Sequence, residues 1–130
     1  MHRCLVGTKG PFQGSTMVLG ARVGIGRGDV HGIQIVDDPL VSRDHASLGL
    51  AQDGSSTIRD DFSRNGTFVN GKKVRACRLK DGDRIDIGGS SFVFREMTDE
   101  ELARQEEARI LHVASGPALD LTMTGGPQGC

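Results

Sequence analysis

The stretch RIDIGGSSFVFRE, residues 84–96, alternates between apolar and polar side chains on both sides of a short glycine-containing turn. Ile85 and Ile87 fall on one face of the first half, and Phe92 and Phe94 fall on one face of the second half. A period of two is typical of half-buried β-strands, and the GGS segment between the halves favours a turn. The stretch therefore predicts two consecutive strands.

Short β-type runs of the same kind fill the chain from residue 4 to residue 96, with turn segments such as DDP, QDGSS, SRNG and KDGD between them. The clearest turn is Asn70-Gly71, between TFV and KKV, because a two-residue hairpin turn favours positive φ at both positions. Many short strands without a helical period indicate an all-β fold. We expect an antiparallel β-sandwich of about 10–11 short strands.

The pattern changes after Met97. In the segment TDEELARQEEARILHV, Thr98 is followed three residues later by Glu101, which is the spacing of a helical capping box. The residues beyond it are rich in glycine and proline, a composition typical of a linker or a mobile tail. We therefore expect one domain over residues 1–97, a connector helix over 98–114 and a flexible tail or linker over 115–130.

The overall charge excludes some classes of partner. Sixteen Lys and Arg residues nearly balance 17 Asp and Glu residues, so that the formal net charge is −1. Such a chain has no global attraction to nucleic acid or to an anionic membrane, and any anion site must be local. The first residues lack the apolar segment of a signal peptide, and no apolar run is long enough to span a membrane. We expect a cytoplasmic protein without nucleic-acid or membrane partners.

Enzyme and metal-site interpretations do not fit the motifs. In SRDH, residues 42–45, an extended backbone places Ser42 and His45 on opposite faces, where the imidazole cannot take the proton of the hydroxyl. The glycines of VGIGRGDVHG, residues 23–32, do not form a G-x-G-x-x-G nucleotide loop. The four histidines are scattered, and no cysteine joins them at ligand spacing. We expect no catalytic residue, metal or cofactor.

Three short polar motifs remain, each at a loop or at the end of a strand: Gly26-Arg27, Ser42-Arg43-Asp44-His45 and Ser63-Arg64-Asn65-Gly66-Thr67. Each offers guanidinium, hydroxyl or amide donors. A phosphate dianion, with three acceptor oxygens and a charge of about −1.5 to −2, is bound by such donors when they converge from separate loops. The alternative interpretation is that all three are ordinary surface turns.

In this order and spacing, the motifs resemble the signature of the forkhead-associated (FHA) domain family, which is Gly-Arg, then Ser-x-x-His, then Asn-Gly, within a β-sandwich. The resemblance covers roughly residues 4–96. It implies a non-catalytic module that binds phosphothreonine peptides. In this family, Arg27 and Ser42 would contact the phosphate, and Asn65 would hydrogen-bond the peptide main chain.

The resemblance also assigns roles to neighbouring residues. Arg43 occupies a variable position that often adds a phosphate or backbone contact. Arg64 stands where many members have Ser or Thr, so that a guanidinium replaces a hydroxyl at the site. The implied supports of the binding loops are Gly26, His45, Gly66 and Asn70.

The implied partner is a protein phosphorylated on threonine by an upstream Ser/Thr kinase, and the chain would be the N-terminal module of a larger regulatory protein. The alternative function is a phosphate-independent interaction or assembly module on the same fold. Binding measured with and without the phosphate distinguishes the two.

Overall fold

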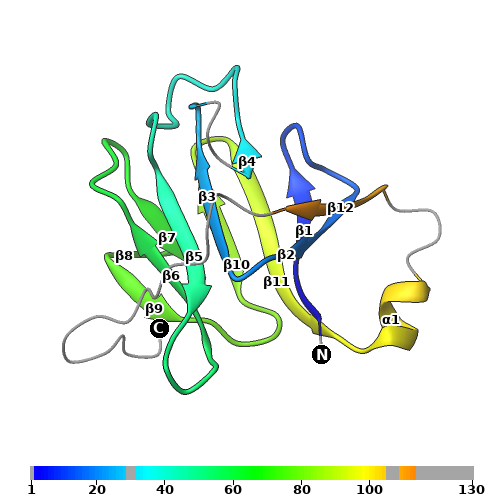
Figure 1. The fold of residues 1–130 in the computed structure, drawn as a ribbon. Helices are drawn as coiled ribbons and strands as arrows, with labels where there is room; N and C mark the ends of the chain where they lie inside the picture. Colours follow the sequence, from blue (N-terminus) through cyan, green and yellow to red (C-terminus); the bar gives the residue numbers. More distant parts are fainter. Residues whose placement is uncertain (1, 29–31, 105–108, 114–130) are drawn as a thin grey trace.

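Two β-sheets pack against each other in the computed structural model, which describes residues 2–28, 32–104 and 109–113 (Figure 1). In the described residues the first sheet has seven strands, in the spatial order β12 (Arg109–Val113), β2 (Ser15–Leu19), β1 (His2–Lys9), β11 (Ser90–Met97), β10 (Arg84–Ile87), β7 (Thr67–Val69) and β8 (Lys72–Val74). The second has five, in the order β4 (Ile33–Gln34), β3 (Arg22–Gly26), β5 (Ala46–Leu50), β6 (Ser56–Asp60) and β9 (Ala76–Arg78).

The predicted β-sandwich is confirmed, with one refinement. Neighbouring strands are antiparallel except for two pairs, β12 with β2 and β3 with β4, which run parallel. Both sheets are therefore mixed. The strands predicted up to residue 96 correspond to β1–β11, and β12 is an additional strand.

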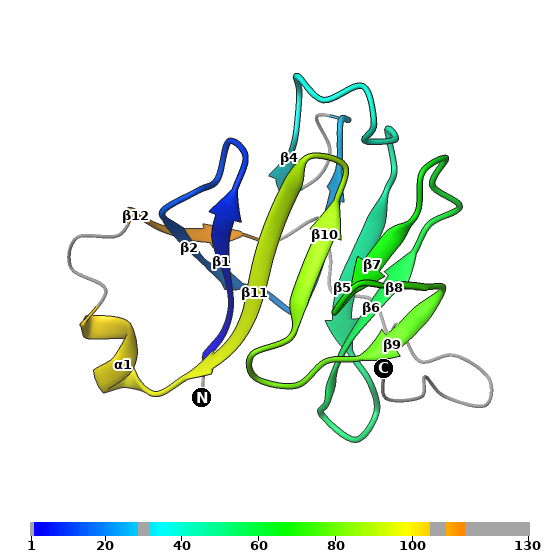
Figure 2. The same cartoon turned by 180° about the vertical axis from the view of Figure 1, so that it is seen from behind.

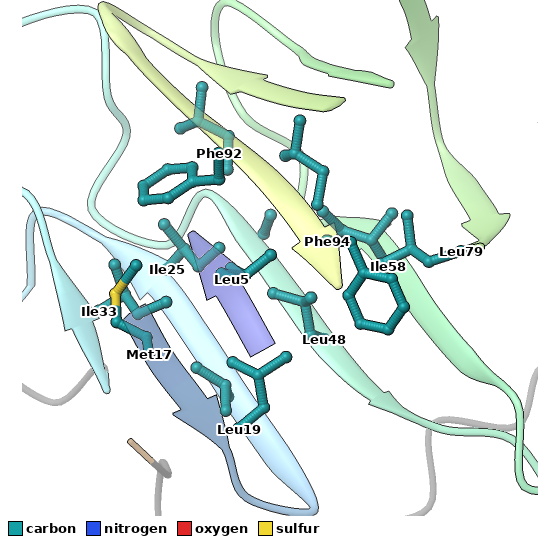
Figure 3. Packing of buried hydrophobic residues seen from close by; sticks show 14 of the residues in the cluster. Leu5, Met17, Leu19, Ile25, Ile33, Leu48, Ile58, Leu79, Phe92 and Phe94 are labelled. Atoms are coloured by element: carbon teal, nitrogen blue, oxygen red, sulfur yellow. The ribbon is translucent and has the colours of Figure 1, made fainter. Parts of the chain in front are cut away.

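The hydrophobic core lies between the two sheets and follows the period-two pattern. Ile85 and Ile87 of β10 and Phe92 and Phe94 of β11 have no exposed side-chain surface. Figure 3 shows the two phenylalanines packed with aliphatic side chains from both sheets, among them Leu48 of β5. Burial of a large apolar side chain contributes about 1.5–3 kcal/mol. This core fixes the register of the strands, because a shift by one residue would expose every inward side chain.

The β7–β8 hairpin has the predicted turn. Asn70 and Gly71 have φ values of 51° and 83°, the positive values that a two-residue hairpin turn requires. The Asn70 amide oxygen accepts a hydrogen bond from the backbone N–H of Arg84 at 3.0 Å, and its NH₂ group donates to the buried carboxylate of Asp83 at 3.0 Å. Asn70 thus joins the hairpin to the start of β10, at the end of β7 opposite to Gly66.

The connector helix predicted over 98–114 is wrong in extent. The capping box at its start is present, since Thr98 and Glu101 exchange hydrogen bonds between side chain and backbone at 3.1 and 3.3 Å. However, α1 spans only Asp99–Ala103, and Arg109–Val113 forms β12 along the edge of β2. Strand pairing there covers the edge of β2 and packs Leu111 and Val113 against the core.

The first sheet consequently extends beyond the boundary predicted at residue 97. The tail predicted over 115–130 lies outside the described residues. Among the described residues, no helix is both long enough and apolar enough to cross a membrane.

Candidate functional site

Three connections meet at one end of the sandwich: the segment that follows β3, the β4–β5 loop (residues 35–45) and the β6–β7 loop (residues 61–66). Figures 1 and 2 show the β4–β5 loop in cyan at this end, together with the end of β3, whereas α1 and the N-terminus lie at the opposite end. Each of the three motifs singled out in the sequence lies in one of these connections.

The first two motifs are joined by backbone hydrogen bonds. The N–H of Arg27 donates to the carbonyl of Ser42 at 3.0 Å, and the N–H of Gly28 donates to the carbonyl of Arg43 at 3.1 Å. Next to them, the N–H of His45 donates to the carbonyl of Ile25 at 2.9 Å. The ladder between β3 and β5 therefore continues past both strands and holds Arg27 beside Ser42.

The third motif is joined to the second by side chains. The Ser42 hydroxyl accepts a hydrogen bond from the backbone N–H of Arg64 at 2.9 Å, and the Asn65 amide donates to the carbonyl of Leu40 at 2.9 Å. Ser42 is thus the residue at which all three connections meet. Among the described residues, the Ser42 hydroxyl proton, the Asn65 carbonyl oxygen and one N–H of the Asn65 amide have no hydrogen-bond partner, because each side chain uses only part of its hydrogen-bonding capacity there.

His45 links two of the loops from the buried side of the site. Its side chain has no exposed surface, its Nδ1 accepts from the N–H of Ser42 at 3.0 Å, and its Nε2 lies 2.8 Å from the carbonyl oxygen of Gly66. Because Nδ1 is an acceptor, the proton is assigned to Nε2, which donates to Gly66. Both ring nitrogens are therefore committed to the backbone, and His45 cannot act as a base toward the Ser42 hydroxyl.

The conformation of residues 42–45 differs from the extended one assumed in the sequence interpretation. The chain bends at Arg43 and Asp44, and β5 begins only at Ala46, so that residues 42–45 are not part of an extended strand. The imidazole of His45 returns to the backbone of Ser42, where an extended segment would have turned it to the other face. A catalytic pair of Ser42 and His45 is still not formed, because the ring contacts the backbone amide of Ser42 and not its hydroxyl.

Gly66 is required by its conformation. Its φ is 92°, in the region that favours glycine, and a Cβ there would lie 2.7 Å from Cε of Lys73. The aliphatic part of Lys73 therefore packs directly on the β6–β7 loop. Gly26, the other predicted support, is buried at the end of β3, where its carbonyl accepts from the N–H of Ile35 at 2.9 Å.

Two aspartates shape the loops and were missed by the sequence analysis. The Asp60 carboxylate accepts hydrogen bonds from the backbone and hydroxyl of Ser63 and from the Thr67 hydroxyl, the last at 2.8 Å. The Asp38 carboxylate accepts from the N–H of Leu40 at 2.9 Å and from that of Gly89 at 2.6 Å. Asp-x-x-Ser and Asp-Pro-Leu are local signals for such turns, but the contact with Gly89 joins distant segments and leaves no such signal.

The surface of the site is rich in donors. Arg27, Arg43 and Arg64 are exposed, and within the described part of the chain none of the three takes part in an ion pair. The carboxylates of Asp38 and Asp60 are occupied by the donors described above. The described residues contain no cluster of three potential metal ligands. The arrangement is chemically suited to an anion held by guanidinium, hydroxyl and amide groups.

Comparison with known families gives an independent view of these loops. The model of the FHA domain matches residues 23–88 of this chain, a stretch that contains all three motifs. A solved structure from work on phosphothreonine-dependent FHA domain interactions superposes with a TM-score of 0.66 at 29% identity, covering 75% of this chain and 99% of that one.

Curated relatives are longer than the matched region. The ABC transporter ATP-binding/permease protein Rv1747 of Mycobacterium tuberculosis is 46% identical over 85 residues, which cover 65% of this chain and 9% of that protein. The glycogen accumulation regulator GarA of Mycolicibacterium smegmatis is 37% identical over 91 residues, covering 69% and 56%. The chain thus spans less than two thirds of the length of these relatives.

Proposed function

Because this chain belongs to the FHA domain family, we propose that it is a non-catalytic module that binds protein segments carrying phosphothreonine. The observation that carries the proposal is the junction at Ser42, where the Arg27 backbone and the Arg64 backbone are both hydrogen-bonded. Donors from three connections are thereby brought to one exposed anion site.

The proposed roles follow from the groups left available. The guanidinium of Arg27 and the hydroxyl of Ser42 bind the phosphate oxygens. The second amide N–H and the carbonyl oxygen of Asn65 pair with the peptide main chain, and Arg43 and Arg64 add further cationic contacts. Each hydrogen bond to a charged group contributes about 1.5–3 kcal/mol. Two or three of them with main-chain contacts reach about −8 kcal/mol, the free energy of micromolar binding.

The partner in this proposal is a protein phosphorylated by a Ser/Thr kinase in the cytoplasm. We also propose that the domain acts as a module of a larger regulatory protein, which is supported by the relatives in which the matched region is one part of a longer chain. A bare phosphate ion forms too few contacts for tight binding, so selectivity must come from the peptide around the phosphothreonine.

The test is a pair of degenerate peptide libraries that differ only in a fixed central residue, phosphothreonine in one and threonine in the other. We expect capture of the phosphorylated library at least tenfold above the other. Equal capture would contradict the proposal and favour a phosphate-independent interaction module.

A further inference from the structure

Phe62, in the β6–β7 loop, combines two unfavourable properties. Its side chain is 92% exposed, the highest value for a large apolar residue among those described, and its φ is +59°. A bulky side chain rarely takes a left-handed backbone conformation, which glycine adopts without cost. The chain therefore carries a phenyl ring at a position where neither burial nor backbone preference favours one.

The neighbouring contacts enforce this conformation. On one side, the N–H of Asp61 donates to the carbonyl of His45 at 2.9 Å. On the other, the N–H and hydroxyl of Ser63 are held by the carboxylate of Asp60. Phe62 lies between two fixed points, and its side chain is held outward. Strained residues that the surrounding structure enforces are concentrated at functional sites.

The ring borders an open groove of about 1000 Å³, lined by residues 59–63 and 73–76. The carboxylates in this lining are already occupied: Asp60 by Ser63 and Thr67, and Asp61 by Arg59 and Ser47. We call this surface the Phe62 groove.

The lining also contains two exposed cationic side chains. Lys73 and Arg75 are exposed and form no ion pair with any residue in the described ranges. The groove therefore combines an aromatic face with unpaired positive charge, which is complementary to a segment that is both apolar and acidic.

The groove adjoins the β6–β7 loop, which also carries part of the proposed phosphate site. The stem of Lys73 packs on Gly66, within the same loop as Arg64 and Asn65. Phe62 precedes Arg64 in this loop, and the backbone N–H of Arg64 donates to the hydroxyl of Ser42 at 2.9 Å. The groove is thus placed to contact the peptide beside the phosphorylated residue.

We propose that the Phe62 groove binds the part of the partner that flanks the phosphothreonine, with a large apolar side chain on the Phe62 ring and an acidic residue paired with Lys73 or Arg75. The inference rests on the proposed function and supplies its selectivity. We expect the contact between the apolar side chain and the ring to change affinity about threefold to tenfold, which corresponds to about 0.6–1.4 kcal/mol.

The test uses the phosphothreonine library with a fixed central residue and degenerate flanks, screened against the wild type, Phe62→Gly and the double variant Lys73→Gln/Arg75→Gln. Glycine relieves the backbone strain, so the melting temperature of Phe62→Gly should equal or exceed that of the wild type. We expect Phe62→Gly to lose the threefold to tenfold enrichment of large apolar residues at one flanking position, and the double variant to lose the enrichment of acidic residues.

The outcomes are separable. If Phe62→Gly keeps both the preference for phosphothreonine and the flanking enrichment of the wild type, the groove proposal is wrong and the proposed function stands. If no protein distinguishes phosphothreonine from threonine, the proposed function fails and the groove proposal fails with it. If sedimentation shows a wild-type dimer that Phe62→Gly disperses, the groove is a contact between copies, and the proposal is overturned.

Discussion

His45→Ala tests the part of the account in which one buried side chain organises the binding loops. In the wild type, the imidazole accepts from the N–H of Ser42 at 3.0 Å and donates to the carbonyl of Gly66 at 2.8 Å. Alanine removes both bonds at a position with no exposed surface. The variant leaves one donor and one acceptor without their partner and creates a void between two loops.

The expected cost follows from these contacts. Each buried polar group that loses its partner costs about 1–3 kcal/mol, so the two together reduce the free energy of unfolding by about 2–6 kcal/mol. For a domain of this size, a change of 1 kcal/mol moves the melting temperature by about 4–8 °C. We therefore expect a fall of at least about 8 °C.

The assay is thermal unfolding followed by circular dichroism, with two comparison variants. His45→Asn keeps an oxygen near the position of Nδ1 but cannot reach Gly66, and it should fall between alanine and the wild type. Arg43→Ala, in the same loop, changes an exposed side chain and keeps the carbonyl that pairs with Gly28, so its melting temperature should stay within about 2 °C. A His45→Ala protein as stable as Arg43→Ala would refute the reasoning.

Three further variants separate binding from stability. Arg27→Ala should weaken phosphopeptide binding, measured by calorimetry, by at least about tenfold. It should leave the melting temperature nearly unchanged, because the backbone hydrogen bond to Ser42 remains. Unaltered affinity would contradict the role of Arg27 in phosphate binding. Asn70→Ala should lower the free energy of unfolding by about 2–4 kcal/mol, and Asn70→Gly by about 1 kcal/mol less because glycine tolerates a φ of 51°; equal costs in urea titrations would show that φ does not matter there. Asp81→Asn tests stability in acid. Hydrogen bonds from the N–H of Glu96 and from the Arg95 guanidinium lower the pKa of Asp81 below its usual value. The carboxylate therefore stabilises the fold above the unfolded-state pKa of about 3.9 and loses this effect as the pH falls through the lower, folded-state pKa. The stability difference between wild type and Asp81→Asn should therefore shrink on acidification, and a constant difference would exclude the linkage.

Much of the sandwich could be predicted because its signals are local. Alternation at Ile85, Ile87, Phe92 and Phe94 and the Asn70-Gly71 turn depend on neighbours within a few residues. The donor side chains of the three motifs could also be identified from the sequence, although their order along the chain does not give the distances between them in the fold. Convergence at Ser42 depends on hydrogen bonds to segments 15 and 22 residues away along the chain, which only the folded chain defines.

The errors have a common physical cause. The capping box at Thr98 does start a helix, but Arg109–Val113 pairs with the free edge of β2, and a sheet edge is not visible in a local pattern. Asp38 was missed because its partner Gly89 lies far along the chain. Phe62 was passed over because a single phenylalanine in a turn carries no signal until its φ and exposure are known.

The most direct test of the central claim is an amide NMR titration of the ¹⁵N-labelled chain with a degenerate phosphothreonine peptide and its threonine counterpart. The account predicts that the phosphorylated peptide changes the amide chemical shifts of Arg27, Ser42 and Arg64, and that the threonine peptide leaves them unchanged. Shifts confined to a different face, or the same shifts with both peptides, would contradict it.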